Sequence, residues 1–162
     1  TYAQAHADIF ASPDWQRVDF SMTACGEDYR GQAVISVDRA CEILIGFTSL
    51  MPVETYMGHG LRKDIVQFLK DSHPRFMRYP GGCIVEGFSL ETAMRFSNTI
   101  GPVWERPSHN LMWHYRTTNG FGDHEFLQLC EDLDMEPMYV CNCGMSWTVQ
   151  SCFPAAGFKI NR

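Results

Sequence analysis

A cationic side chain stands at the end of a predicted strand, directly before a turn. The segment "RFMRY" (75–79) has the apolar and aromatic content of a buried strand, yet it carries Arg78, and Pro80-Gly81-Gly82 follows at once. A buried cation is costly unless carboxylates pair with it. Arg78 therefore has two interpretations: it orients acidic groups in a site at the strand end, or it forms a purely structural ion pair. Gly81 and Gly82 let the backbone turn sharply and approach a ligand closely, although Pro-Gly-Gly alone is not specific.

Carboxylates and thiols are the other candidate groups. Glu86 follows the Pro-Gly-Gly turn and is placed to line a site there, whereas Glu125 begins a predicted helix, where a carboxylate also suits the helix dipole. The chain has seven cysteines, so at least one thiol is unpaired. Cys141 and Cys143 form the only close pair, and Cys-x-Cys alone is a weak metal signal. We expect no metal and no other cofactor, and we interpret the cysteines as small apolar residues.

Composition and charge restrict the class of protein. Hydrophobic residues make up 45% and charged residues 20% of the 162 residues, a balance typical of a globular domain. The net charge is -6 without a basic stripe, so we expect no nucleic-acid partner. No apolar run approaches the length of a membrane span, so we expect no membrane partner. No initiator Met or signal peptide is visible at Thr1, and we expect the chain to begin inside a longer protein.

Residues 1–50 have the sequence pattern of β structure. Along most of the segment "WQRVDFSM" (15–22), polar and apolar side chains alternate. The segments "GQAVISVD" (31–38) and "CEILIGFTSL" (41–50) are short, rich in β-branched residues and separated by polar turns. Short strands at regular spacing are typical of an antiparallel sandwich. There are too few strands for a complete one, so the pattern predicts part of a sandwich.

Beyond Pro52 the pattern becomes helical. Apolar residues recur at helical spacing in "GLRKDIVQFLKD" (60–71), at Leu61, Ile65, Phe68 and Leu69, and in "HEFLQLCEDL" (124–133), at Phe126, Leu129, Cys130 and Leu133. A proline, a strand and a glycine-ended turn follow each helix, and the strands are 75–79 and 138–142. This repetition predicts an α/β domain whose parallel strands are joined by the second helix.

The connection from Ile84 to Phe121 is longer than is usual between a strand and a helix. It is too rich in aromatic residues for a disordered segment, since it contains Phe88, Phe96, Trp104, Trp113, Tyr115 and Phe121. We predict a binding loop on the face where the parallel strands end, because ligands bind there in such folds.

The segment "LRKDIVQFLKDSHPRFMRYPGGCIVEG" (61–87) resembles the α-L-arabinofuranosidases of glycoside hydrolase family 51. The resemblance continues through residues 98–146, and "TSLMP" (48–52) resembles the junction at which, in one branch, an inserted carbohydrate-binding-type β-sandwich returns to the barrel. It implies an α/β fold, an incomplete (β/α)8 TIM barrel segment preceded by part of an antiparallel β-sandwich. The corresponding ranges are 1–50 for the C-terminal part of the sandwich, 51–146 for the partial barrel and 147–162 for a divergent tail.

The resemblance also implies an activity and a set of site residues. The family releases terminal α-L-arabinofuranosyl groups with retention, which implies a secreted enzyme and arabinose-containing polysaccharides or oligosaccharides, such as arabinan and arabinoxylan, as partners. Arg78 matches the active-site arginine of the R-x-P-G-G motif, and Cys83 stands where other branches carry a sugar-contacting asparagine. Asn142 matches the asparagine that ends the third barrel strand. Trp113 and Tyr115 fall in the substrate-facing loop, where an aromatic ring suits the apolar C–H side of a sugar. The alternative for these two residues is packing within the loop.

The sequence also departs from the family. Gly46 replaces an aspartate that is usual before the junction. Residues 147–162 no longer resemble the family. The family's two catalytic glutamates end later barrel strands, which we expect beyond residue 162, and the first barrel strand is expected before Thr1. We therefore predict that the chain alone is inactive and assign no catalytic role to its tempting carboxylates, Glu86, Glu105 and Glu125.

Three functional classes stay open at this point. The first is part of a secreted arabinofuranosidase, which the family resemblance favours. The second is a noncatalytic carbohydrate-binding module, favoured by the sandwich-like start and the aromatic loop. The third is a cysteine-based metal or redox protein, which would require stoichiometric metal.

Overall fold

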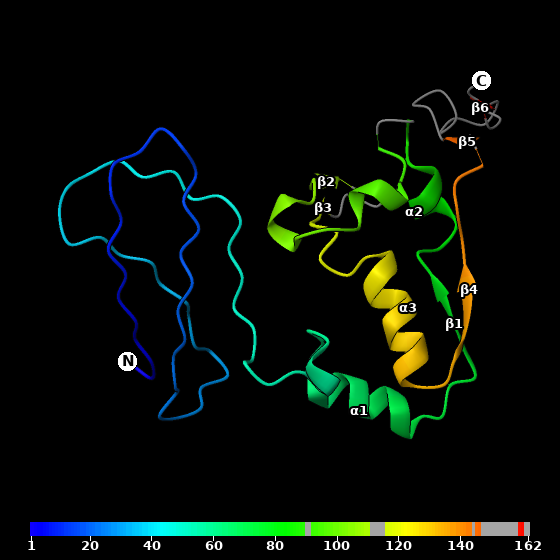
Figure 1. Cartoon of the computed structure of the whole chain (residues 1–162), viewed down its shortest axis with the longest axis horizontal. Coiled ribbons are helices and arrows are strands. Elements are labelled where there is room, and N and C mark those ends of the chain that lie inside the picture. Colours follow the sequence, from blue (N-terminus) through cyan, green and yellow to red (C-terminus); the bar gives the residue numbers. More distant parts are fainter. Residues whose placement is uncertain (90–91, 111–115, 144, 147–158, 161–162) are drawn as a thin grey trace. The chain divides into compact units, whose positions relative to one another are not determined.

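The structure is a computed structural model, and it describes residues 1–89, 92–110, 116–143, 145–146 and 159–160 (Figure 1). The chain divides into two compact units, Thr1–Gly46 and Phe47–Arg162, which are described separately. In the described ranges no helix combines the length and the apolar character that a bilayer crossing needs.

The first unit, Thr1–Gly46, contains no helix and no strand. Its backbone contacts are few, such as the Cys25 N–H donating to the Tyr2 carbonyl at 2.8 Å, and its large apolar side chains are exposed, with Trp15 at 74% and Val34 at 77%. The strands predicted within residues 1–50 are therefore not formed in this structure. The physical reason is that a strand needs a neighbour for its N–H and C=O groups and a second layer over its apolar face. The assignment of residues 1–50 to a β-sandwich stays a prediction.

The second unit is organised around two parallel strands. Strand β1 (Phe76–Tyr79) pairs with β4 (Glu136–Tyr139), with Phe76 opposite Glu136 and Tyr79 opposite Tyr139 (Figure 1). Helix α3 (Asp123–Asp132) precedes β4 and packs against both strands. The predicted parallel pairing with the second helix as its crossover is confirmed, although β4 begins and ends earlier than the predicted 138–142.

Pro137 lies inside β4 without interrupting the pairing. The N–H groups of Glu136 and Val140 donate to β1-side carbonyls of Arg75 and Tyr79, both at 2.9 Å. Because successive N–H groups of a strand point to opposite sides, the position of Pro137 faces the edge of β4 away from β1. A proline is tolerated there because it has no N–H to donate to the β1–β4 pair.

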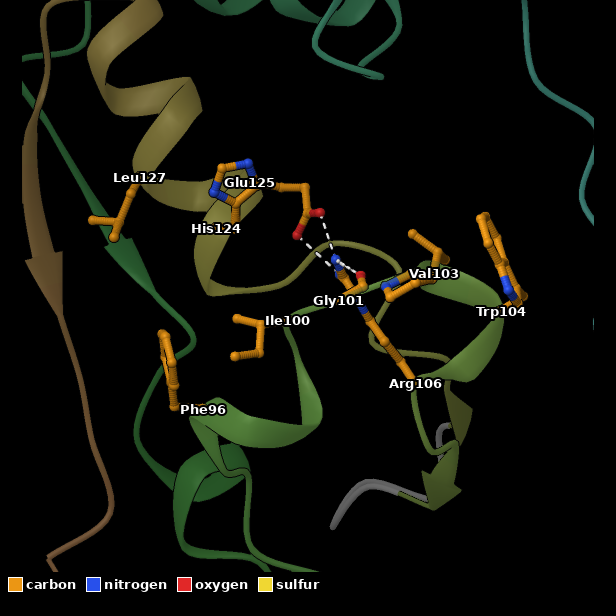
Figure 2. Close-up of a pocket in the computed structure, with 10 residues that line it drawn as sticks. Phe96, Ile100, Gly101, Val103, Trp104, Arg106, His124, Glu125 and Leu127 are labelled. Atoms are coloured by element: carbon orange, nitrogen blue, oxygen red, sulfur yellow. Dashed lines mark hydrogen bonds and ion pairs between the residues drawn. The ribbon is translucent and has the colours of Figure 1, made fainter.

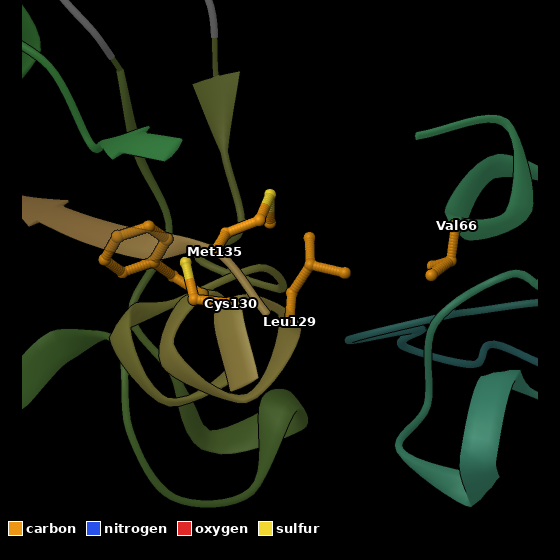
Figure 3. Packing of buried hydrophobic residues seen from close by; sticks show 5 residues of the cluster. Val66, Leu129, Cys130 and Met135 are labelled. Carbon is orange, nitrogen blue, oxygen red and sulfur yellow. The ribbon is translucent and has the colours of Figure 1, made fainter. Parts of the chain in front are cut away.

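The core lies between helix α3, the strand pair and helix α1 (Lys63–Asp71). Phe126, Leu129 and Cys130 of α3 are between 0% and 3% exposed, as their helical spacing predicts. Figure 3 shows Val66 of α1 pointing toward Leu129 of α3. Burial of these apolar side chains provides the main stabilisation of the unit, because each fully buried large side chain contributes about 1.5–3 kcal/mol.

Helix α1 exists as predicted, but it packs on a different face. Leu61 precedes the helix, and this residue and Leu69 contact the core together with Val66, which is 2% exposed. Ile65 and Phe68, which the spacing assigned to the buried face, are 50% and 72% exposed. The apolar arc of α1 is therefore wider than its contact with α3, and its outer half has no covering layer among the described residues.

The remaining elements are short. They are the 3-10 helices η1 (Tyr56–Gly58), η2 (Phe96–Asn98) and η3 (Val103–Glu105), helix α2 (Cys83–Glu86), and the strands β2 (His109–Asn110), β3 (Arg116–Thr117), β5 (Met145–Ser146) and β6 (Lys159–Ile160). β2 pairs antiparallel with β3, and β5 pairs antiparallel with β6. The predicted binding loop therefore contains most of the short helices and one small hairpin.

Candidate functional site

The carboxyl end of β1 carries Arg78 on the face that points away from α3. Met77 and Tyr79 pack against the core on the α3 side, so Phe76 and Arg78 take the opposite face by the alternation of a strand. Arg78 is exposed, which corrects the expectation that it is a buried cation, because nothing among the described residues covers this face. It forms no salt bridge with a described carboxylate, so the alternative of a structural ion pair has no partner in this part of the chain.

The guanidinium of Arg78 lies over the glycines that follow the strand. A Cβ on Gly82 would stand 3.6 Å from Nη2 of Arg78, and one on Gly81 would stand 4.0 Å from Nη1. Gly81 has a φ of +131°, a conformation that residues with a side chain rarely adopt. The Pro-Gly-Gly turn therefore lets the backbone fold closely beneath the cation.

The end of β4 is tied to the turn that follows β1. The side-chain amide of Asn142 donates to the carbonyl of Val85 at 2.9 Å. Val85 belongs to helix α2, whose first residue is the half-buried Cys83. The structure thus brings Asn142, Cys83 and Arg78 to neighbouring positions at the ends of the two parallel strands.

Trp113 and Tyr115, the two predicted aromatic contacts, lie outside the described residues. The flanking strands are described: His109 pairs with Thr117 and Asn110 with Arg116, and Nη2 of Arg116 donates to the hydroxyl of Ser108 at 2.9 Å. The antiparallel pair of β2 and β3 is referred to below as the aromatic hairpin, because the sequence between the two strands contains Trp113 and Tyr115.

Tyr79 joins the end of β1 to the start of α3. Its hydroxyl donates to the Phe121 carbonyl at 2.7 Å, and its ring stacks on Phe126 with 5.2 Å between the ring centroids. Burial, together with the charges of Asp123 and Glu125, raises the pKa of Tyr79 to about 12. Tyr79 therefore stays a neutral hydrogen-bond donor, and its contacts fix the position of the start of α3 relative to the end of β1.

A buried arginine connects the long loop to α3. The Nε and Nη2 groups of Arg106 donate to the Gly101 carbonyl at 3.0 and 2.9 Å, and Nη1 donates to the Asn119 carbonyl at 2.8 Å. Nη1 and Nη2 also donate to the two carboxylate oxygens of Glu125 at 2.9 and 2.7 Å. An arginine has five N–H donors, and these contacts use each of its nitrogen atoms. Arg106, Asn119 and Glu125, with the main chain of Gly101, are called the Arg106 cluster below.

Glu125 has a structural role in this cluster. This agrees with the sequence analysis, which assigned it no catalytic role. Its Oε2 also accepts the Gly122 N–H at 2.8 Å, at the first turn of α3. Burial by itself would raise the pKa of Glu125, but hydrogen bonds from Arg106 and Gly122 outweigh it and lower the pKa below its ordinary value. Sequence reasoning identified Glu125 as a helix start and missed Arg106, whose only signal was a cation within an aromatic, proline-flanked loop.

The backbone of Gly122 fits closely against Thr99, which is fully buried. A Cβ on Gly122 would stand 2.1 Å from the Thr99 carbonyl oxygen, so no other residue fits without a shift. The Thr99 hydroxyl lies 2.7 Å from Asp123 Oδ2 and accepts the Asp123 N–H at 3.1 Å. The long loop is thereby attached to the first turn of α3 at a second point.

A shallow apolar pocket lies on the outer side of α3 (Figure 2). It is lined by Phe96, Ile100, Gly101, Pro102, Val103, Trp104, Arg106, His124, Glu125 and Leu127. Arg78, Cys83 and Asn142, the predicted site residues that the structure describes, do not line it. Arg106 also lines this pocket, but its N–H groups already donate to protein acceptors. Its guanidinium is therefore not available to bind an anion in the pocket.

The described residues contain no group of three or more His, Cys, Asp or Glu side chains arranged to hold a metal ion. The described cysteines are unpaired thiols, with Cys141 and Cys143 exposed on either side of Asn142.

Comparison with protein families identifies the unit that contains β1, α3 and β4. The model of the "Alpha-L-arabinofuranosidase 1 domain" matches residues 68–157, more than half of the chain. The chain belongs to the α-L-arabinofuranosidases of glycoside hydrolase family 51.

Individual members of the arabinofuranosidase family agree with this assignment. "Alpha-L-arabinofuranosidase 1" of Arabidopsis thaliana is 40% identical over 133 residues, covering 82% of this chain and 20% of that protein. The "Extracellular exo-alpha-L-arabinofuranosidase" of Streptomyces chartreusis is 30% identical over 153 residues, covering 83% of this chain and 18% of that protein. The chain thus spans about one fifth of the length of these relatives.

A solved arabinofuranosidase structure supports the fold of the second unit. The arabinose-bound MgGH51 α-L-arabinofuranosidase superposes with a TM-score of 0.53 at 37% sequence identity, covering 57% of this chain and 15% of that chain. At this identity the likeness supports common family membership as well as a common local fold.

The close contact at Gly122 gives a first prediction. In the full-length protein, Gly122→Ala should lower stability by about 1–3 kcal/mol, because the added methyl group forces α3 away from Thr99. The thermal unfolding midpoint measures the effect. Gly120→Ala is the matched control, since its nearest neighbour would be the movable Thr118 hydroxyl at 3.2 Å. Equal midpoints for the two variants would contradict the prediction.

The lowered pKa of Glu125 gives a second prediction, on pH. A depressed carboxyl pKa stabilises the folded state above the unfolded-state pKa of glutamate, and this contribution is lost as the pH falls through the lower folded-state pKa. Glu125→Gln should therefore be less stable than wild type at pH 7, and the difference should shrink below about pH 4. Urea unfolding midpoints across this range measure it. The exposed Glu105→Gln is the control, and a pH-independent difference for Glu125→Gln would refute the linkage.

Proposed function

We propose that this chain is a segment of a retaining α-L-arabinofuranosidase that releases terminal α-L-arabinofuranosyl groups from arabinan- or arabinoxylan-type polysaccharides. The observation that carries the proposal is the match of the arabinofuranosidase domain to residues 68–157, a range that includes β1, α3, β4 and the predicted site residues. The match favours this activity over a noncatalytic carbohydrate-binding module and over a metal or redox protein.

The segment fits two adjacent strands of a (β/α)8 barrel. β1 and β4 run parallel, and α3 crosses between them on one face, which is the repeating unit of such a barrel. The opposite face, with Phe76 and Arg78, would then point into the barrel interior. Residues 1–50 would belong to the inserted β-sandwich. The family model extends to residue 157, so the divergent tail expected over residues 147–162 would be confined to its last five residues.

The proposed sugar-binding residues are Arg78, Cys83, Trp113, Tyr115 and Asn142. The positions of Arg78, Cys83 and Asn142 at the strand ends support this assignment, because barrel enzymes bind their substrates at the carboxyl ends of the strands. Arg78 would orient the catalytic carboxylates through its fork of N–H donors, and the aromatic hairpin would contact the sugar ring.

The catalytic carboxyl groups belong to other strands of the proposed barrel. A retaining glycosidase needs two of them about 5–5.5 Å apart, one as nucleophile and one as acid/base. The extracellular relative from Streptomyces chartreusis supports the further proposal that the full-length enzyme is secreted.

The test of the proposed function uses the full-length protein. It should hydrolyse an aryl α-L-arabinofuranoside, and NMR of the first product formed should show the α-anomer, because retention preserves the configuration. An initial β-anomer would overturn the retaining mechanism. Binding of arabinan without any hydrolysis would favour the carbohydrate-binding module instead.

A further inference from the structure

The range 141–143, with the sequence Cys-Asn-Cys, follows strand β4 at its carboxyl end. The last residues paired between β1 and β4 are Tyr79 and Tyr139, and the Val140 N–H still donates to the Tyr79 carbonyl at 2.9 Å. Residues 141–143 therefore lie beyond the paired part of the strand. Both cysteines of this range are exposed, unpaired thiols, and the proposed sugar site does not use them.

The two thiols belong to one short, anchored piece of backbone. The Cys143 thiol donates to the Cys141 carbonyl at 3.8 Å, so its sulfur lies beside the backbone of the first cysteine. Between them, the Asn142 side chain donates to the Val85 carbonyl at 2.9 Å. Cα atoms two residues apart are at most about 7 Å from each other. One atom bound to both sulfurs can bridge such a separation, since cysteines joined directly through sulfur already span most of it.

The chemistry of the pair selects soft partners that need few ligands. Thiolates prefer soft, thiophilic centres to hard cations such as Mg²⁺ or Ca²⁺. A structural zinc site needs four ligands, and the described ranges offer no group of three or more His, Cys, Asp or Glu side chains that could supply them. A centre that is satisfied by two sulfur atoms, such as trivalent arsenic in an organic arsenical, fits this pair.

We propose that Cys141 and Cys143 form a dithiol site that captures a thiophilic centre requiring two sulfur ligands, and that capture inhibits the enzyme through Asn142. The ring closed by the two sulfurs contains the backbone of Asn142, so capture changes the conformation from which this residue reaches Val85. The inhibition rests on the proposed function, in which Asn142 contacts the sugar. The capture itself does not rest on it.

The probe is phenylarsine oxide, and the reaction with it is balanced without an oxidant or a reductant. Two S–H bonds and the arsenic–oxygen bond break, two arsenic–sulfur bonds form, and one water molecule leaves with both thiol protons. Arsenic stays trivalent throughout. An excess of 2-mercaptoethanol removes arsenic from single cysteines, whereas a dithiol retains it because its second bond forms within the same molecule.

The first experiment counts phenylarsenic groups by intact-mass spectrometry of the full-length protein under this excess of monothiol. Cys141→Ser and Cys143→Ser should each carry one group fewer than wild type. Cys41→Ser is the matched control, because it removes an exposed thiol of the first unit, and it should keep the wild-type number. Thermal unfolding midpoints equal to that of wild type verify that the variants are folded. The wild-type number in both Cys141→Ser and Cys143→Ser would overturn the site.

The second experiment measures hydrolysis of an aryl α-L-arabinofuranoside. Phenylarsine oxide should lower kcat/KM of the wild type about tenfold or more, since small displacements near a substrate cost up to about 10²-fold in rate. The competing dithiol 2,3-dimercaptopropanol should restore the activity. The double variant Cys141→Ser/Cys143→Ser should have nearly wild-type activity and resist the arsenical.

The outcomes of the second experiment separate the parts of the inference. Capture without loss of activity, or equal inhibition of wild type and double variant, would overturn the inhibition through Asn142. A wild-type enzyme without any arabinofuranosidase activity would instead overturn the proposed function. The mass measurement would then still decide whether Cys141 and Cys143 capture the arsenical.

Discussion

Residues 1–162 expressed alone will not release product from an aryl α-L-arabinofuranoside above the rate of a buffer blank. The proposed reaction needs a nucleophile and an acid/base carboxyl group on facing strands of a closed barrel, and the described part of the chain has only two parallel strands. Glu125 is committed to Arg106 and to the start of α3. Loss of such groups removes most of a rate enhancement that spans many orders of magnitude.

The measurement compares equal, verified concentrations of the 1–162 chain and the full-length enzyme. Turnover by the short chain that disappears in Glu86→Gln would contradict the prediction and would make Glu86 catalytic. The short chain should also associate, since Phe76 and Met138 on the strand pair and Phe68 on α1 are 58%, 49% and 72% exposed. Size-exclusion chromatography should show it as oligomers or aggregates rather than as a monomer.

Arg78→Lys in the full-length enzyme should lower kcat/KM by about a hundredfold at unchanged stability. Arg78 lies on the face of β1 away from the described core, so its replacement removes none of the core contacts that the structure describes. Lysine keeps the charge but cannot orient a carboxylate with two parallel N–H donors, and small errors in such geometry cost about 10²-fold in rate.

The control for Arg78→Lys is Arg75→Lys, which changes an exposed arginine just before the same strand. Both variants should unfold at the wild-type temperature. If Arg78→Lys retains activity within about twofold of wild type at equal stability, Arg78 has no role in orienting the catalytic groups.

Much of the second unit could be predicted from local patterns. The helical spacing of Phe126, Leu129 and Cys130 identified both α3 and its buried face, and the repeated helix–proline–strand order predicted the parallel pair. The face of α1 was only partly predicted. Residues 66 and 69 are three apart, as are residues 65 and 68, so each pair satisfies a helical period, and only the position of α3 decides which pair is buried.

The site was predictable where a motif marks it and not where long-range contacts build it. Arg78 stood out because a cation before Pro-Gly-Gly is unusual, yet its exposure could not be inferred from an apolar strand without knowing which layers cover it. Arg106 bonds to Asn119 and Glu125, which lie 13 and 19 residues away, so no local pattern identifies the set. The strands expected in residues 1–50 also depend on long-range contacts. An alternating pattern leads to a strand only where a partner strand is present to pair with it.

Pro137 also has a consequence for the outer edge of β4, the edge that faces away from β1. Among the described residues this edge has no paired strand. Since Pro137 contributes no N–H there, Tyr139 is the first residue of β4 able to donate to a strand on that side. A proline on an open strand edge opposes pairing with another chain, so this half of β4 is a poor template for edge-to-edge association.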